Sequence, residues 1–464
     1  MASEPLTTTA IPADTPTLGL SAREWLVCLV AGMGFLFDTY EIVVQTIVVR
    51  PALLEISSAP IGSPAFNRWV GWLLFLPFLF GGIAGLLGGY LTDRLGRRRI
   101  LVWSIVLYGI ASVGAAYASS PAELLFWRCL TIIGVCTEWV AATAWIAELF
   151  PDRRRKDAAL GFTQAVTGLG IFLVGGIYYL AVTFGEQLPA IGGSHAGWRY
   201  ALLFGAVPVI PVLLARLWMP ESPRWQALKT VGRLERPSFR ELFRPGLKRI
   251  TLMTSALVAC IYFIAFGAMS HIPRIVPGLS EVRDLPSVQQ EQTISLVHLS
   301  QDMGGLIGRF ALAFLVITVL TRRRVLRTFQ VPGLVIIPAL FFAAPELNVI
   351  AIALWALLAS LMLNGQLNFI GNYLPQMYPT RLRGTGESFA MSVGGRIVGT
   401  SAGLFTPWLA NFTPGASPAE QLAYAAGIVA LIACTLGLIV SRFLIEPSTL
   451  SSEALTRGRS AEDT

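Results

Sequence analysis

Residues 89–99 read Gly-Tyr-Leu-Thr-Asp-Arg-Leu-Gly-Arg-Arg-Arg and join two long apolar runs, Val70–Leu91 and Ile100–Ala118. Each run has about the 20 residues that a helix needs to cross a bilayer. Glycines in the turn allow two helix ends to approach closely, and Asp93 is placed to cap a neighbouring helix N-terminus. Short arginine-rich turns between membrane helices stay in the cytoplasm. The stretch therefore predicts two membrane-spanning helices joined by a cytoplasmic turn.

The composition is that of a helical protein that crosses the membrane many times. Of the 464 residues, 54% are hydrophobic and 13% are charged, whereas soluble domains carry roughly 25% charged residues. The formal net charge is +8. Because the basic residues cluster in short turns on one side, this charge indicates a membrane protein rather than a nucleic-acid binder. We expect a lipid bilayer as the surroundings, no nucleic-acid partner, and a location in the plasma (inner) membrane.

Residues able to hold a metal or to perform catalysis are sparse. The three histidines are scattered, and the five cysteines fall inside apolar runs without the spacing of metal ligands. The sequence has no Walker loop, no HExxH motif and no catalytic triad. It therefore predicts no cofactor, no metal site and no enzymatic activity.

Twelve apolar segments are long enough to span the bilayer. They predict an all-α membrane protein with 12 transmembrane helices in two pseudo-symmetric six-helix bundles. Lysine and arginine gather in the connections on one side, which places both chain termini in the cytoplasm. The predicted spans are Trp25–Val49, Val70–Leu91, Ile100–Ala118, Ala122–Phe150, Ala158–Phe184, Trp198–Met219, Ile250–Pro273, Ile294–Thr321, Leu326–Phe342, Leu347–Tyr373, Ser388–Ala410 and Leu422–Leu444.

A basic, polar stretch divides the spans six and six. The predicted organisation is a cytoplasmic tail at 1–22, a helical bundle at 23–225, a linker at 226–248, a second bundle at 249–444 and a tail at 445–464. We expect the chain to be a monomer. The two halves are similar in sequence at equivalent places. Glu148–Arg155 after the fourth span and Gln376–Arg383 after the tenth share a proline and two arginines at the same offsets. Duplicated halves of six spans are typical of alternating-access transporters.

Charged residues within the spans are the first candidates for function, because they are costly in a membrane. Counted at 1.5 Å per residue, Asp38 in the first span and Arg128 in the fourth both lie about 10 Å from the outer face. The sequence therefore predicts an Asp38–Arg128 pair, with Glu41 one turn nearer the outside. Glu138 lies ten residues deeper than Arg128 and is excluded from this pair.

The predicted pair suggests proton coupling through Asp38, Glu41 and Arg128. Burial favours the neutral acid, whereas a neighbouring guanidinium favours the carboxylate, so the two effects nearly cancel. Small changes in hydration would then load or release a proton. The alternative is a permanently ionised bridge that only holds two helices together.

Two arginines of the second half suggest recognition of an anionic substrate. Arg309 and Arg396 both lie near the middle of the membrane, and guanidinium groups bind carboxylates well. For Arg309 an internal pair with Asp302 is the alternative. The tenth span also carries amides that either bind a polar ligand or tie helices together. The candidate substrate residues are thus Arg309, Arg396, Asn364, Gln366, Asn368 and Asn372.

Charges of both signs at the cytoplasmic helix ends predict a gate that closes the inner face in one state. A positive-inside pattern alone does not explain the acids among them. The candidate gate residues are Gly89, Asp93, Arg94, Gly96, Arg97, Arg98, Glu148, Arg153, Glu221, Arg224, Arg381 and Glu387.

With these motifs, the chain resembles the major facilitator superfamily, in particular its sugar and metabolite symporters. The stretches that carry the resemblance are Gly89–Arg99, Glu148–Arg155 and Pro220–Trp225. In proton-coupled sugar symporters an acid of the first helix pairs with an arginine of the fourth, and Asp38 and Arg128 match those positions.

Two shorter motifs resemble aromatic-acid/proton symporters. Asp38-x-x-Glu41 is similar to their Asp-Gly-x-Asp element, although Thr39 and Glu41 depart from it. Gly395-Arg396-x-x-Gly399 resembles their eleventh-helix arginine motif. The resemblance implies proton-coupled symport of a small organic anion, with substrate and protons as the partners. A sugar or polyol symporter is the second candidate, and a membrane sensor that does not transport is the third.

Overall fold

The computed structural model describes residues 22–149, 153–215, 221, 222, 225, 226, 230, 238–318, 321–379 and 382–445. Its long elements are all helices. The first half contains α1 (Ala22–Ile56), α2 (Pro64–Leu95), α3 (Arg97–Ala116), α4 (Pro121–Leu149), α5 (Arg153–Phe184), η1 (Gly185–Gln187), α6 (Gly197–Phe204) and α7 (Val209–Ala215). The second half contains η2 (Phe239–Phe243), α9 (Lys248–Gly267), η3 (Met269–His271), α10 (Ile272–Ile275), η4 (Val276–Gly278), α11 (Ser287–Thr318), α12 (Arg322–Ala343), η5 (Ala344–Glu346), α13 (Val349–Met377), α14 (Arg383–Phe389), η6 (Ala390–Val398), η7 (Gly399–Ser401), α15 (Ala402–Leu409) and α16 (Pro418–Ser441).

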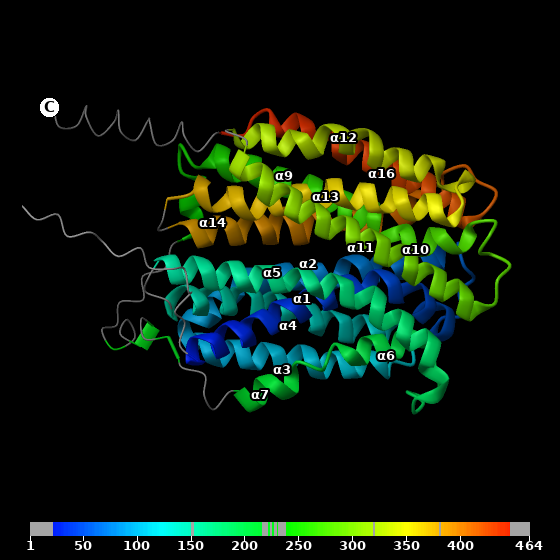
Figure 1. The fold of residues 1–464 in the computed structure, drawn as a ribbon, viewed down its shortest axis with the longest axis horizontal. Helices are drawn as coiled ribbons and strands as arrows, with labels where there is room; N and C mark the ends of the chain where they lie inside the picture. Colours follow the sequence, from blue (N-terminus) through cyan, green and yellow to red (C-terminus); the bar gives the residue numbers. More distant parts are fainter. Residues whose placement is uncertain are drawn as a thin grey trace, which may run out of the picture.

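The two halves form two layers of helices that run in the same general direction. Figure 1 shows the first half, blue to green, below the second half, yellow-green to red. Between the layers, α5 packs along α11, and α2 packs along η6 and α15. The fifth span thus contacts the eighth, and the second contacts the eleventh. The second and eighth spans are equivalent in the two halves, as are the fifth and eleventh, so the two contacts are related as expected for a duplicated fold.

The predicted fold class is confirmed, and the helices occupy all twelve predicted spans. Nine helical segments of the described chain are long and apolar enough to cross a membrane. The other three spans are interrupted or polar. The sixth is broken into α6 and α7 by a turn at residues 205–208, α11 carries Glu291, Asp302 and Arg309, and the eleventh changes from α14 to the π-helix η6.

Several helices extend beyond their predicted apolar runs. α1 continues to Ile56 rather than ending at Val49, and α11 begins at Ser287 rather than at Ile294. Hydropathy marks the part of a helix that lies in lipid, whereas backbone hydrogen bonding continues into the polar interface. The difference matters below, because functional residues lie in these extensions.

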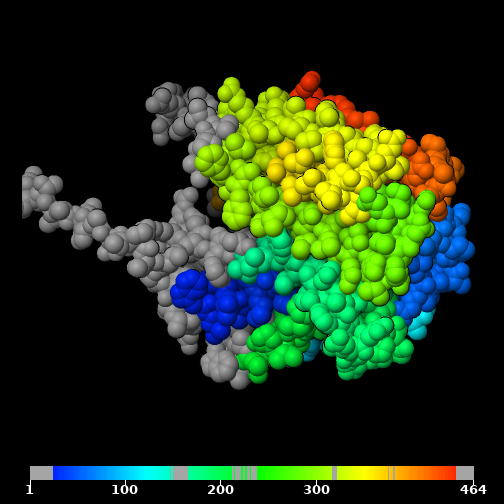
Figure 2. All heavy atoms as spheres, turned by 45° about the vertical axis from the view of Figure 1, so that its right-hand side comes forward, coloured from blue at the N-terminus to red at the C-terminus, as the bar shows by residue number. Residues whose placement is uncertain are grey.

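The two ends of the bundle are distinct. We call the end where α1 begins and α14 lies the tail end (left in Figure 1), and the opposite end, which carries α10, the far end. Figure 2 brings the far end forward, and there the first half (blue) lies directly against the second (orange).

Close helix packing in the second half leads to a stability prediction. A methyl group at Gly304 of α11 would overlap the carbonyl oxygen of Leu357 in α13, whereas a methyl group at Gly371 would meet no atom within 4 Å. Gly304→Ala should therefore lower the unfolding free energy by about 1–3 kcal/mol. The matched control, Gly371→Ala, should be neutral or raise it by about 1 kcal/mol through helix propensity. Thermal unfolding in detergent measures both, and a Gly304→Ala protein as stable as the wild type would contradict the packing.

Candidate functional site

A fully buried ion pair joins the first and fourth spans. The Arg128 Nη1 atom lies 2.5 Å from Glu41 Oε2, and both side chains are completely buried. Arg128 also donates a hydrogen bond of 2.5 Å to the Glu41 backbone carbonyl, and the Ser112 hydroxyl of α3 donates one of 2.5 Å to Glu41 Oε1. The pair thus ties α1, α3 and α4 together, although the Arg128 Nε atom has no hydrogen-bond partner in the described structure.

The predicted Asp38–Arg128 pair is wrong, because Arg128 pairs with Glu41. Asp38 and Glu41 are three residues apart on one helical face, which corresponds to about 4.5 Å along the axis. Counting from the ends of apolar runs cannot resolve one helical turn. The ion pair is therefore displaced by one turn from the predicted position.

Asp38 instead lies beside Glu138 of α4. The two carboxyl groups are close enough to influence each other electrostatically, and the Tyr108 hydroxyl lies near Glu138. Both acids are buried, and within the described chain their carboxyl oxygens, like the nearby Tyr108 hydroxyl, have no hydrogen-bond partner. Glu138 also lies against α1 at Gly34, where a methyl group would overlap its Oε1 atom. The sequence analysis excluded Glu138 only from the pair with Arg128, and the position of Glu138 beside Asp38 was not predicted.

Arg396 of the second half reaches across to these acids. It lies on the π-helix η6, a rare geometry that is frequent at functional sites. Its Nη1 atom comes within 3.1 Å of the position that a Cβ atom at Gly85 of α2 would occupy. A methyl group at Gly85 would require the guanidinium group to shift by a few tenths of an ångström. The Arg396 charge interacts with Asp38, so the boundary between the halves separates a buried cation from two buried acids.

The other predicted substrate residues make most of their contacts within the second half. Arg309 of α11 approaches Gly168 of α5 and interacts electrostatically with Asp302, but the described structure contains no ion pair between Asp302 and Arg309. Asn364, Gln366 and Asn368 each donate a hydrogen bond to the carbonyl group four residues earlier in α13. The side chain of Asn372 lies outside the described residues.

The tail-end cluster connects elements of the first half. Arg97 binds Glu148 through two hydrogen bonds of 2.9 and 3.0 Å, and Ser222 donates one of 2.6 Å to the same carboxylate. Glu221 accepts hydrogen bonds from the backbone N–H groups of Arg97 and Arg98. Gly96, with φ of 101°, gives the turn a conformation that other residues rarely adopt.

The remaining predicted gate residues are distributed differently. A methyl group at Gly89 would meet no atom of the described residues within 4 Å, so the part of the chain that the structure describes does not show the expected close approach at this glycine. Arg94 donates to the Tyr90 hydroxyl, and Glu387 is half-buried on α14. The side chains of four further candidates lie outside the described residues: Asp93, Arg153, Arg224 and Arg381.

The halves are bridged at the far end, by residues that sequence reasoning missed. Glu291 of α11 accepts hydrogen bonds of 2.7 Å from Arg50 of α1 and from Tyr178 of α5. Asn67 of α2 donates to Asn411 at 3.0 Å. Glu291 escaped notice because it precedes the predicted eighth span, in the helical extension described above. Within the described chain, the hydrogen bonds between the halves lie at this end.

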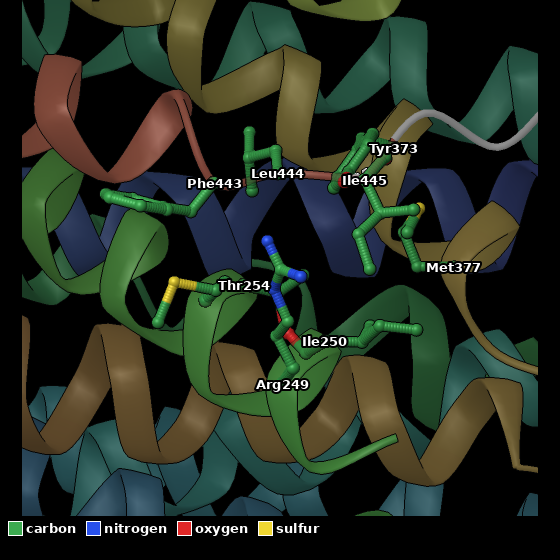
Figure 3. A pocket seen from close by; sticks show the side chains of 9 residues that line it. Arg249, Ile250, Thr254, Tyr373, Met377, Phe443, Leu444 and Ile445 are labelled. Carbon is green, nitrogen blue, oxygen red and sulfur yellow. Dashed lines mark hydrogen bonds between the residues drawn. The ribbon is translucent and has the colours of Figure 1, made fainter. Parts of the chain in front are cut away.

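A depression in the surface of the second half is separate from the candidate site. It lies at the tail end of the second half, where Arg249 extends toward Leu444 and Ile445 among mainly apolar side chains (Figure 3). It belongs to one half only and is remote from the acids of α1 and α4. It therefore does not form part of the candidate site.

The sequence matches the protein-family model described as Major Facilitator Superfamily over residues 25–403. The chain belongs to this superfamily. It is therefore a multi-pass membrane transporter and not an enzyme, and the resemblance inferred from its motifs is confirmed.

Members of the superfamily with known names resemble the chain over most of its length. The niacin transporter NiaP of Acinetobacter baylyi is 23% identical, over 79% of this chain and 82% of the relative. The gallate transporter of Pseudomonas putida is 24% identical, over 83% of this chain and 86% of the relative. The crystal structure of a D-xylose-proton symporter, 20% identical, superposes with a TM-score of 0.69 and covers 91% of this chain and 98% of that one.

The observed pairing predicts that substitutions of the neighbouring acids Glu41 and Asp38 change the unfolding free energy differently. Glu41→Gln leaves the buried Arg128 guanidinium without its counter-charge, so unfolding free energy should fall by about 3–5 kcal/mol. Asp38→Asn removes no ion pair and should have little effect or stabilise the protein. Thermal or denaturant unfolding of the purified variants measures both. A large loss in Asp38→Asn with no change in Glu41→Gln would instead support the pairing predicted from sequence.

Proposed function

We propose that the chain imports a small organic anion together with protons by alternating access. The observation that carries this proposal is Arg396, a buried cation of the second half that lies against α2 of the first half, close enough to the buried acid Asp38 to influence its charge. Substrate and proton would bind at this boundary, near the middle of the membrane. Many transporters that are built from two repeats bind their substrates between the repeats, near the middle of the membrane.

The proton would be held by the Asp38–Glu138 pair. Two adjacent carboxylates in an apolar site repel each other strongly, so such a pair tends to hold one proton between them. Two unit charges 4 Å apart at an effective dielectric constant of 20 interact by about 4 kcal/mol. A cation that came this close to Asp38 would favour the loss of its proton, and we propose that Arg396 exerts this influence.

The substrate would act through Arg396. A bound carboxylate neutralises the guanidinium group, which removes the cation that favours an ionised Asp38. Binding of the anion would thus promote binding of the proton, and release of either would promote release of the other. This reciprocity is the basis of symport. The pair Arg128–Glu41 would take no part in the proton transfer, because each charge already has its partner.

The relatives support an anionic substrate. Gallate and niacin each contain a carboxylic acid, and the proteins named for their transport align with most of this chain. A neutral sugar is less well supported, since the amides of α13 are bonded to their own helix. The proton-coupled xylose symporter supports the fold, and its substrate is a control for the experiments below.

The two ends of the boundary suggest the direction of the conformational change. The far-end bridges at Glu291 join the halves, whereas the ion pair of Arg97 and Glu148 lies within the first half. We propose that the tail end faces the cytoplasm, with both termini, and that the described conformation is closed on the outside. The halves would rock about the central site in a monomer.

Removal of the acid should separate coupling from exchange. Asp38→Asn in proteoliposomes should abolish accumulation driven by an imposed pH gradient and retain counterflow of labelled substrate, because counterflow needs no net proton movement. Asp284→Asn, which changes an acid that is 83% exposed, is the matched control and should accumulate substrate normally. Normal accumulation by Asp38→Asn would refute the proton site. No uptake of any substrate by the wild type would favour the sensor.

Removal of the guanidinium should weaken recognition of carboxylates. A thermal-shift screen of carboxylates and sugars first identifies a stabilising ligand. Arg396→Gln should raise the apparent transport constant for that carboxylate at least tenfold, as expected for loss of a charge-assisted hydrogen bond of about 1.5–3 kcal/mol. Arg283→Gln, at a highly exposed arginine, should leave it unchanged. An unaltered constant in Arg396→Gln, or stabilisation by sugars alone, would contradict an anionic substrate.

A further inference from the structure

A second cavity lies between the halves at the far end. Its volume is about 160 Å³, and it is lined by Arg50 and Asn67 of the first half and by Arg274 and Ser417 of the second. It is formed where the blue and orange parts of the chain meet in Figure 2. A cavity of about 150 Å³ in another protein holds benzene. The space is therefore sufficient for a molecule with one six-membered ring.

The cavity carries a positive charge that no acid balances. Arg50 is neutralised by Glu291 at 2.7 Å. Arg274 is 9% exposed and has no ion pair in the described part of the chain; it binds only the neutral groups Asn67 Oδ1, at 3.1 Å, and His271 Nδ1, at 3.3 Å. Arg50 and Arg274 also repel each other. Two arginines and one acid leave a charge of about +1 at the cavity wall.

Nearby acids do not supply the missing charge. Glu420, in the first turn of α16, turns back to accept a hydrogen bond of 2.8 Å from the backbone N–H of Ala416, and it does not line the cavity. Buried guanidinium groups keep their proton and are normally paired with an anion. An arginine beside an open cavity can satisfy this requirement with a bound ligand.

We propose that this far-end cavity is a binding site for a small carboxylate, separate from the site at Arg396. The carboxylate bonds to Arg274 and Arg50, and its apolar part lies against Phe66, Pro277 and Leu422. Arginine binds carboxylates through two parallel hydrogen bonds, which gives both affinity and orientation.

Ligand binding at this site is coupled to conformation. The two halves both contribute to the cavity, so the complete site exists only while the halves are closed at the far end. A ligand that binds one conformation better than another shifts the population toward it. A carboxylate in the cavity therefore stabilises the conformation that is open at the tail end. On the proposed orientation, a high external concentration slows return to the outward-open state.

Binding can be measured without transport. The probe is benzoate, titrated calorimetrically into the purified full-length chain, with neutral benzamide as the matched ligand. Arg396→Gln is used as the starting protein, so that carboxylate binding at the central site is weakened. Benzoate should bind this protein saturably and benzamide should not. Failure of the proposed proton-driven uptake would leave this result unaffected, so the two proposals are tested separately.

Variants of the cavity assign the site. Adding Arg274→Gln should weaken benzoate binding at least tenfold, whereas adding Arg283→Gln, an exposed arginine of the same end, should not change it. Ile61→Trp, at a half-exposed position of the lining, keeps the charges but obstructs the cavity and should also weaken binding. Unchanged affinity in both cavity variants, equal binding of benzamide, or displacement of benzoate by equimolar chloride would overturn the proposal.

Discussion

A charge buried in an apolar bundle needs a counter-charge close by, and this requirement organises the structure around Arg128 and Glu41. The pair is completely buried, makes further hydrogen bonds to Ser112 and the α1 backbone, and joins three helices of the first half. Breaking such a pair costs far more than an exposed one, because either partner alone remains desolvated. A rigid first half is the consequence, and it supports Asp38 and Glu138 on the same two helices, α1 and α4.

At the boundary between the halves, the buried charged groups have a counter-charge nearby only in part. Asp38 and Glu138 lie together and form no ion pair in the described part of the chain, and Arg396 of the other half is close enough to influence Asp38. Charges balanced within one half fix that half internally, whereas charges balanced across a moving boundary depend on conformation. This difference explains why the neighbouring acids Glu41 and Asp38 are expected to have different roles, one in stability and one in coupling.

The two ends of the boundary also differ in their polar contacts. Arg97 binds Glu148 through its side chain and Glu221 through its backbone N–H, all within the first half, while Glu291 connects α11 to α1 and α5 of the other half. The turn that dominates the sequence thus holds its own half together in this conformation. Closure depends on an acid that lies outside the apolar runs. The unbalanced Arg274 is at the same closed end, which links occupancy of its cavity to the state of the bundle.

The amino-acid sequence by itself determined the membrane class, the twelve spans and the superfamily. These follow from the length and polarity of local runs and from the cationic turn at residues 89–99, which need no knowledge of contacts. It also identified Asp38, Arg128 and Arg396 as costly charges within spans. Only the tertiary structure decided which charges meet. One helical turn advances the chain by about 5.4 Å and a hydrogen bond spans about 3 Å, so an uncertainty of three residues exchanges Glu41 for Asp38.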